Sequence, residues 1–540
     1  MKKSRKYNIK KFAVILLVAT FVCVNIIALT GCDNTQKETT FDNTYKPPVY
    51  NTSGEDKQAI IVLPGMFASN LVNAETNEPL WSGGGLMNNL FMTQFRVTKA
   101  EVSNYFKSFL YKDEQGNSVV PIRAATMYDK YLQYGLIDEY RNMYKFFNNK
   151  YNEGVTDESK KYEVVIYQYD WTKSAKESAE ELNQFITANN YKNNILVGHN
   201  LGGIVCDYYL AQNEASRLNT KGFISLGTPH FGTMSSVFAF SDFNIDLSNE
   251  NELFKIMDLL GIKINLGELN DFKNSVLDSI MGLKLVDKIP LEYIPENVDT
   301  SNLTAEQTLK IVLPFIQDVA TDVISFVKTM PSLYDMLPSE EIYTGNVTIN
   351  GEAKTYSEFI QAIKNTPNVK SNAQIATAID NAINNRKSLY IGGKFVSNVF
   401  NKTYYIAGNG SPSTRTITGV NFTTKPNDSK MYLKLDTDNI KNLPSYTEFE
   451  SYDSEGNKFI NYTPKYVGDG LVTIDSATAN NYENGVTKSN ITVFALNQYY
   501  TNQDLQTPVA PSENMDMLPI IVPNELGKAI NDAITKYILR

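Results

Sequence analysis

Histidine and cysteine are scarce in this chain of 540 residues, and their scarcity limits its chemistry. The two histidines are His199 and His230, so a mechanism that needs an imidazole base must use one of them. The three cysteines, Cys23, Cys32 and Cys206, are too few for a disulfide framework and lack the spacing of a zinc site. We therefore expect no disulfide scaffold, no bound metal and no cofactor.

Positive charge is also in short supply. The formal net charge is −9, and residues 1–31 hold six basic side chains and no acidic one, so the rest of the chain carries −15. No basic stripe compensates for it, and this balance argues against nucleic acid as a partner. Apolar residues make up 42% of the chain, enough for one large α/β domain with insertions or for two or three smaller domains.

The amino terminus has the form of an export signal. Basic residues precede an apolar run from Phe12 to Leu29, and small residues follow directly before Cys32. Residues 1–31 resemble a bacterial lipoprotein signal peptide, with Cys32 as the lipidated first residue of the mature chain. The alternative is an uncleaved membrane anchor, since the run is nearly long enough to span a bilayer. Either way we expect an extracytoplasmic body beside the membrane, on a flexible tether of residues 32–57.

The most informative stretch runs from Asn194 to Asp207. A short apolar run, 194–197, is followed by Gly-His-Asn-Leu-Gly-Gly and then by apolar residues at helical spacing. Strand, glycine-rich turn and helix are the setting of the nucleophile elbow G-x-S-x-G. The central residue here is Asn200, so the frame of a hydrolase is present without its serine.

Other segments supply the rest of such a fold. Strands are expected at 59–63, 162–166, 222–226, 403–406 and 491–496, with a helix beginning near Lys173. Their alternation predicts an α/β fold with a doubly wound, mostly parallel sheet. In an α/β hydrolase the loop after the first of these strands and the residue after the nucleophile donate the oxyanion-hole N–H groups, which makes Met66 and Leu201 the candidates.

Seven motifs, in order, resemble the lecithin:cholesterol acyltransferase family of lipases and acyltransferases. They are Leu63-Pro64-Gly65, Tyr169-Asp170-Trp171, Gly198–Gly203, Leu226–Pro229, Pro331–Tyr334 with Leu337-Pro338, Tyr405–Gly408 and Gly468–Val472. The resemblance implies an α/β-hydrolase fold whose core has two halves, 58–233 and 403–540. Residues 234–402 would be a large helical cap.

Within that insertion the alternation of strands and helices is lost. Thr304 to Gln307 has the pattern of a capping box, and the long apolar segment that it opens is expected to be interrupted at Pro314. By resemblance this cap would lie over the site, where an acyl chain could bind. A helical subdomain that packs on itself and binds no ligand is the alternative.

The resemblance also shows what the catalytic triad lacks. Asp469, between two glycines, fits the position of the acid. No histidine follows the last strand; Asn514 stands where the family's histidine segment is matched, and Asn497 is a second candidate for that position. His199 is expected to point into the packing between strand and helix, and His230 to have a structural role. Cys206, on the helix after the elbow, is not a replacement nucleophile.

Acyl transfer needs an activated nucleophile and a base that takes its proton, and a carboxamide is neither. Our leading hypothesis is a membrane-anchored, catalytically inactive member of this family that binds an acyl lipid or ester without turnover. One alternative is an active lipase, phospholipase or acyltransferase with a non-standard nucleophile. The other is a surface module for protein interaction, whose partner the sequence does not identify.

Overall fold

The computed structural model describes eighteen stretches of the chain. They are 56–81, 96–125, 138–233, 236, 285–287, 289–300, 303–343, 348–349, 352–365, 367–370, 372–409, 420–424, 431–435, 447–452, 458–463, 472–481, 490–495 and 529–539. The predicted signal peptide, Cys32 and nearly all of the tether lie outside these residues. So do Asp469, Asn497 and Asn514, and their assignments stay predictions.

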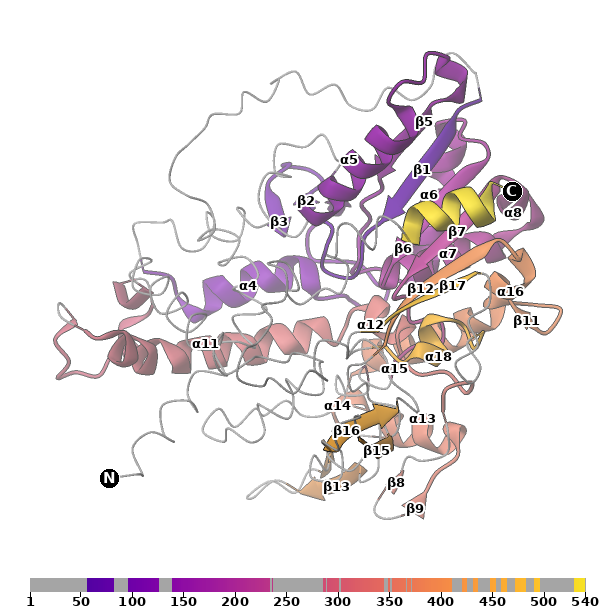
Figure 1. The fold of residues 1–540 in the computed structure, drawn as a ribbon. Coiled ribbons are helices and arrows are strands. Elements are labelled where there is room, and N and C mark those ends of the chain that lie inside the picture. Colours follow the sequence, from indigo (N-terminus) through magenta and orange to yellow (C-terminus); the bar gives the residue numbers. More distant parts are fainter. Residues whose placement is uncertain are drawn as a thin grey trace.

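A six-stranded parallel sheet forms the centre of the molecule (Figure 1). In spatial order its strands are β17 (Ile491–Ala495), β12 (Thr403–Asn409), β7 (Thr220–Leu226), β6 (Asn194–His199), β1 (Gln58–Leu63) and β5 (Tyr162–Ile166). Every pairing between these strands is parallel. The predicted α/β class with a mostly parallel sheet is confirmed.

Helices cover both faces of this sheet, because alternate residues of each strand point to opposite sides. Leu63, Leu196 and Phe223 pack towards α6 (Ala175–Ala188), α7 (Leu201–Gln212) and α16 (Val396–Phe400). The intervening strand residues pack towards α5 (Asp138–Asn152) and the carboxyl-terminal helix, which includes the π-helical turns Ala533–Ile538. Since both faces are buried, the strands read as apolar runs instead of alternating patterns.

Two long helices lie side by side next to this core, α4 (Lys99–Leu110) and α11 (Ala305–Val327) (Figure 1). Ser103 Oγ donates to Asp322 Oδ2 at 2.6 Å, which joins the two helices. Thr304 and Gln307 exchange the two hydrogen bonds of a capping box, as predicted. The expected interruption at Pro314 is wrong: α11 continues through it. Pro314 is exposed, so water can hydrate the carbonyl that its missing N–H leaves unpaired.

Beyond α11 the insertion contains a second small hydrophobic cluster. Its helices are α12 (Pro331–Asp335), α13 (Tyr356–Lys364), α14 (Pro367–Lys370) and α15 (Ala373–Arg386). The insertion also contains the strands β8 (Thr348–Ile349) and β9 (Glu352–Ala353). They form a four-stranded sheet with β13 (Val420–Thr424) and β14 (Met431–Leu435), which follow the insertion in the sequence. Sequence patterns did not predict these strands.

Shorter elements complete the described chain. The strands are β2 (Leu71–Asn73), β3 (Pro79–Trp81), β4 (Ile122–Ala124), β10 (Tyr390–Ile391), β11 (Lys394–Phe395), β15 (Thr447–Tyr452) and β16 (Lys458–Thr463). The helices are α8 (Glu214–Leu218) and α18 (Ile474–Ala477), with 3-10 turns at Glu158–Lys160, Leu285–Asp287, Leu291–Tyr293 and Lys387–Leu389. Among the described helices, none combines the length and the apolar character needed to cross a bilayer.

Candidate functional site

Asn200 occupies the sharp turn between β6 and α7. Its backbone lies at φ 50° and ψ −122°, a conformation that few residues other than glycine adopt. Its N–H donates to Leu226 O at 3.1 Å, and its carbonyl accepts from Gly203 N at 3.0 Å. Asparagine tolerates positive φ better than most side chains, so the elbow keeps its shape without serine.

The glycines after Asn200 let α7 approach the sheet closely. A Cβ on Gly202 would lie 2.4 Å from the carbonyl oxygen of Leu63 in β1. A Cβ on Gly203 would lie 1.8 Å from Thr228 Oγ1, in the loop after β7. Only residues without a side chain fit at these two positions. The glycine pattern therefore reflects close contact with the backbone at the end of β1 and with the buried side chain of Thr228, and it persists although the nucleophile is absent.

The side chain of Asn200 contacts the loop after β1. Met66 N–H donates to Asn200 Oδ1 at 3.4 Å. Asparagine at the first position of a helix usually caps it, but Asn200 makes no capping hydrogen bond to α7. Leu201, the other predicted oxyanion-hole residue, is fully buried as the first residue of α7. The structure thus brings Met66, Asn200 and Leu201 together.

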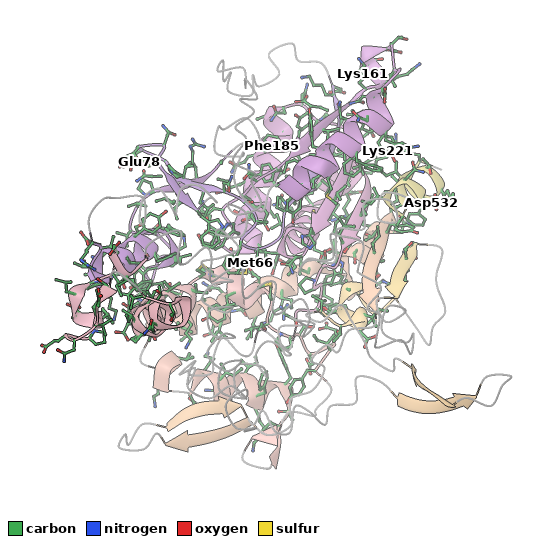
Figure 2. All side chains as sticks on the ribbon, turned by 60° about the vertical axis from the view of Figure 1, so that its left-hand side comes forward. Met66, Glu78, Lys161, Phe185, Lys221 and Asp532 are labelled. Carbon is green, nitrogen blue, oxygen red and sulfur yellow. The ribbon has the colours of Figure 1, made fainter. Side chains whose placement is uncertain are left out.

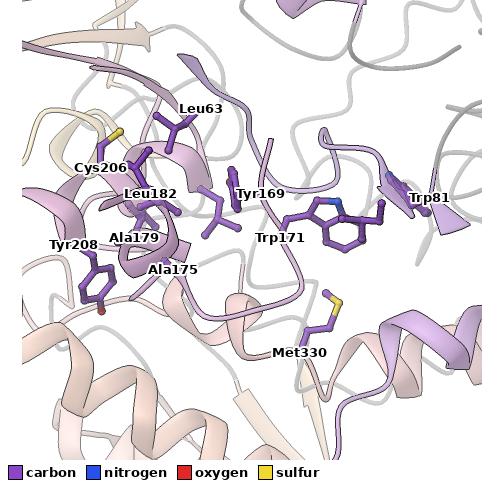
Figure 3. Close-up of a cluster of buried hydrophobic side chains, with 14 of the residues drawn as sticks. Leu63, Trp81, Tyr169, Trp171, Ala175, Ala179, Leu182, Cys206, Tyr208 and Met330 are labelled. Atoms are coloured by element: carbon purple, nitrogen blue, oxygen red, sulfur yellow. The ribbon is translucent and has the colours of Figure 1, made fainter. Parts of the chain in front are cut away.

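Side chains hold the backbone of the loop 64–70 at almost every step. We call this segment the oxyanion loop. The bonds are Tyr169 Oη to Pro64 O, Gly65 N to Tyr140 Oη, Trp81 Nε1 to Phe67 O, Trp171 Nε1 to Ser69 O and Asn70 N to Gln168 Oε1. Figure 2 labels Met66 near the centre of the molecule, and Figure 3 shows Trp171 between Tyr169 and Trp81. The direction of the Met66 N–H is therefore set before any ligand arrives.

Phe67 shows that this loop is held under strain. Its φ of 64° is unfavourable for an aromatic residue. Its ring packs edge-on against Trp171 at a centroid distance of 4.7 Å and lies 6.0 Å from Trp81. Because both indole N–H groups also donate to the loop, the surrounding contacts outweigh the cost of this conformation.

His199 precedes Asn200 but points away from the elbow surface. Its Nδ1 lies 2.6 Å from Tyr140 Oη. The same hydroxyl accepts the Gly65 N–H at 3.0 Å, so it links the His199 ring to the loop after β1. Burial lowers the pKa of His199 from 6.5 to about 3. This histidine supports the oxyanion loop through Tyr140 and is not a base for a reaction at Asn200.

His230 belongs to a buried Ser–His–Asp chain that the sequence analysis did not anticipate. Its Nε2 lies 2.8 Å from Ser225 Oγ in β7, and its Nδ1 lies 2.5 Å from Asp207 Oδ2 in α7. Ser225 and Asp207 are fully buried and His230 is 2% exposed. Burial raises the pKa of Asp207, and the neighbouring His230 opposes that shift. The bonding order is that of a catalytic triad, but no member faces solvent.

One signal in the sequence could have revealed the hydrogen-bonded series Ser225–His230–Asp207. Asp207 is a charged residue inside a helix whose other inward positions are apolar, and buried carboxylates are rarely left unpaired. Cys206 beside it is fully buried, and burial raises the pKa of its thiol, which leaves it protonated and unreactive. Tyr140, by contrast, lies in no recognisable motif.

A parallel sheet with a strand–elbow–helix turn and a tethered oxyanion loop defines an α/β-hydrolase scaffold. Residues 96–257 match the family model for lecithin:cholesterol acyltransferase, which confirms the resemblance seen in the motifs. This part of the chain is therefore similar to the lecithin:cholesterol acyltransferase family, and the sheet around it has the α/β-hydrolase arrangement.

The structure is similar to "The crystal structure of Tle4-Tli4 complex", with a TM-score of 0.38 and 13% sequence identity over 79% of this chain and 89% of the other. Comparison with curated proteins gave no match.

Proposed function

We propose that this protein binds an acyl lipid or ester at the elbow without turning it over. The observation that carries the proposal is the contrast between Asn200 and the oxyanion loop. A carboxamide stands where the nucleophile belongs, while the loop that would hold an acyl carbonyl is tethered by five side-chain hydrogen bonds. An oxyanion hole alone gives about 10³–10⁴-fold acceleration over water, far below ordinary turnover.

Ester hydrolysis tests this proposal directly. The wild-type protein and the Asp469→Ala variant are assayed with p-nitrophenyl esters of short and long acyl chains. We expect both to show the same small rate. Robust turnover by the wild type that Asp469→Ala abolishes would overturn the proposal, because it would show a working triad.

Restoration of the missing groups tests the site itself. Asn200→Ser is combined with Asn514→His in one variant and with Asn497→His in another. We expect ester hydrolysis to rise in one of the two pairs and not in Asn200→Ser alone, because a serine needs its base. A gain in one pair would also identify the position of the lost histidine.

The Ser225–His230–Asp207 chain supports a second candidate, an active enzyme with a non-standard nucleophile. These residues have the hydrogen bonds that an activated serine requires. Their burial opposes this candidate, because an ester could reach Ser225 only after α7 separates from β7. Labelling with a fluorophosphonate probe that is lost in Ser225→Ala would establish it.

We also propose that Cys32 carries the lipid that anchors the protein to the outer face of a bacterial cell membrane. The support is the apolar run ending in small residues directly before Cys32. Stable anchoring needs more than one acyl chain, which lipidation of this type supplies. Metabolic labelling with an alkyne fatty acid is expected to mark the wild type and not Cys32→Ala.

A further inference from the structure

The orientation of the Asn200 carboxamide limits what the elbow can bind. Met66 N–H can only donate, so the side-chain atom that faces it is the oxygen Oδ1. The Nδ2 amide group therefore points the other way, and no described residue accepts a hydrogen bond from it. Asn200 is half-buried, so this N–H₂ group remains within reach of a ligand. The elbow offers a donor where a hydrolase has a nucleophilic lone pair.

The same contact fills the place of a substrate carbonyl. In a working hydrolase the ester oxygen accepts from the oxyanion-loop N–H. Here Asn200 Oδ1 already accepts from Met66, and an amide oxygen is a stronger hydrogen-bond acceptor than an ester oxygen. An ester would have to displace the stronger acceptor. An ionised carboxylate does not face this barrier, because charge-assisted hydrogen bonds are roughly twice as strong as neutral ones.

We propose that the elbow binds the ionised carboxylate of a fatty acid in preference to the corresponding ester. This inference rests on the proposed function, in which the site holds an acyl ligand. A carboxylate oxygen accepts from Asn200 Nδ2, the donor that the contact between Oδ1 and Met66 N–H leaves facing away from the loop. The partly exposed apolar side chains of Met66 and Phe67 provide the contact for the first carbons of the chain.

The protein contains its own reporter for this site. It has two tryptophans, Trp81 and Trp171, and both donate their indole N–H to the oxyanion loop. Both rings also pack against Phe67, next to Met66. A ligand in contact with Met66 and Phe67 therefore lies next to a ring that packs against both tryptophans. Intrinsic tryptophan fluorescence measures binding here without a label.

The test is a fluorescence titration of the wild-type protein at pH 8 with decanoate and, separately, with methyl decanoate. We expect decanoate to bind about tenfold more tightly, as the stronger charge-assisted hydrogen bond implies. Equal or tighter binding of methyl decanoate would overturn this inference and leave the proposed function intact. If neither ligand binds to protein whose thermal unfolding is cooperative, both the inference and the proposed function fail.

Two variants separate the carboxamide from general damage to the elbow. Asn200→Gly tolerates the positive φ and frees the Met66 N–H, so methyl decanoate should bind more tightly than to the wild type and the preference should shrink. Asn200→Asp keeps the shape but adds negative charge, so decanoate should bind at least about tenfold more weakly, with methyl decanoate changed little. Unchanged preference in both folded variants would show that Asn200 does not select the ligand.

Discussion

Tyr140 Oη and His199 Nδ1 lie 2.6 Å apart on the buried side of the elbow. The same hydroxyl accepts the N–H of Gly65, one residue before Met66. One phenol thus connects α5, the last residue of β6 and the oxyanion loop. The hydroxyl of Tyr140 therefore joins the residue before Asn200 to the loop that faces Asn200.

The Tyr140→Phe variant tests this support. It leaves the buried Gly65 N–H and His199 Nδ1 without their partner, which should lower the free energy of unfolding by about 1–3 kcal/mol. Urea unfolding at pH 7 measures this loss. Tyr151→Phe is the matched control, since its hydroxyl makes one long hydrogen bond at a partly buried position in the same helix. Equal losses in the two variants would contradict the role of Tyr140.

The buried His199 should make stability depend on pH in acid. Burial lowers its folded pKa to about 3, whereas the unfolded chain takes up the proton near 6.5. The unfolded state therefore binds one more proton between these values, and stability falls as the pH falls from about 6.5 towards 3. The slope is at most about 1.4 kcal/mol per pH unit. His199→Gln should remove this contribution, measured as the difference between variant and wild type at pH 7 and pH 5.

Asp335 should make stability depend on pH in the opposite direction to His199. Burial raises its pKa from 3.8 to about 7, although the Ala175 N–H, at 2.6 Å, and Arg386 oppose the shift. The folded state binds one more proton between these values, so this contribution to stability is lost as the pH rises from about 4 to 7. Asp335→Asn cannot ionise and should become more stable relative to the wild type as the pH rises from 5 to 8. A constant difference across that range would contradict this pKa.

Replacing one member of the Asp207–His230 pair should lower the stability of the protein more than replacing both members. His230→Leu leaves a buried carboxylate without its partner, which should cost about 3–5 kcal/mol of stability. Asp207→Leu combined with His230→Leu removes both polar groups and should recover part of that loss. Chemical denaturation of both single variants and the double variant measures the coupling. Strictly additive losses would show that the two side chains do not act as a pair.

The sequence by itself determined the class of scaffold and the absence of a serine at the elbow. Apolar strand runs and the glycines at 198, 202 and 203 are local patterns, because strand burial and close backbone contact restrict residue types position by position. The capping box at Thr304 was predicted from the sequence for the same reason. The continuity of α11 through Pro314 could not be predicted, because it depends on which side of the helix is exposed.

Tertiary structure alone decided what surrounds Asn200. The bond from Met66 joins residues 134 positions apart, and Tyr140 and the two tryptophans reach the oxyanion loop from three other segments. The Ser225–His230–Asp207 chain likewise forms only when α7 packs on β7. Hydrogen bonds between distant segments leave no periodic pattern, since each depends on one distance and one angle that folding sets.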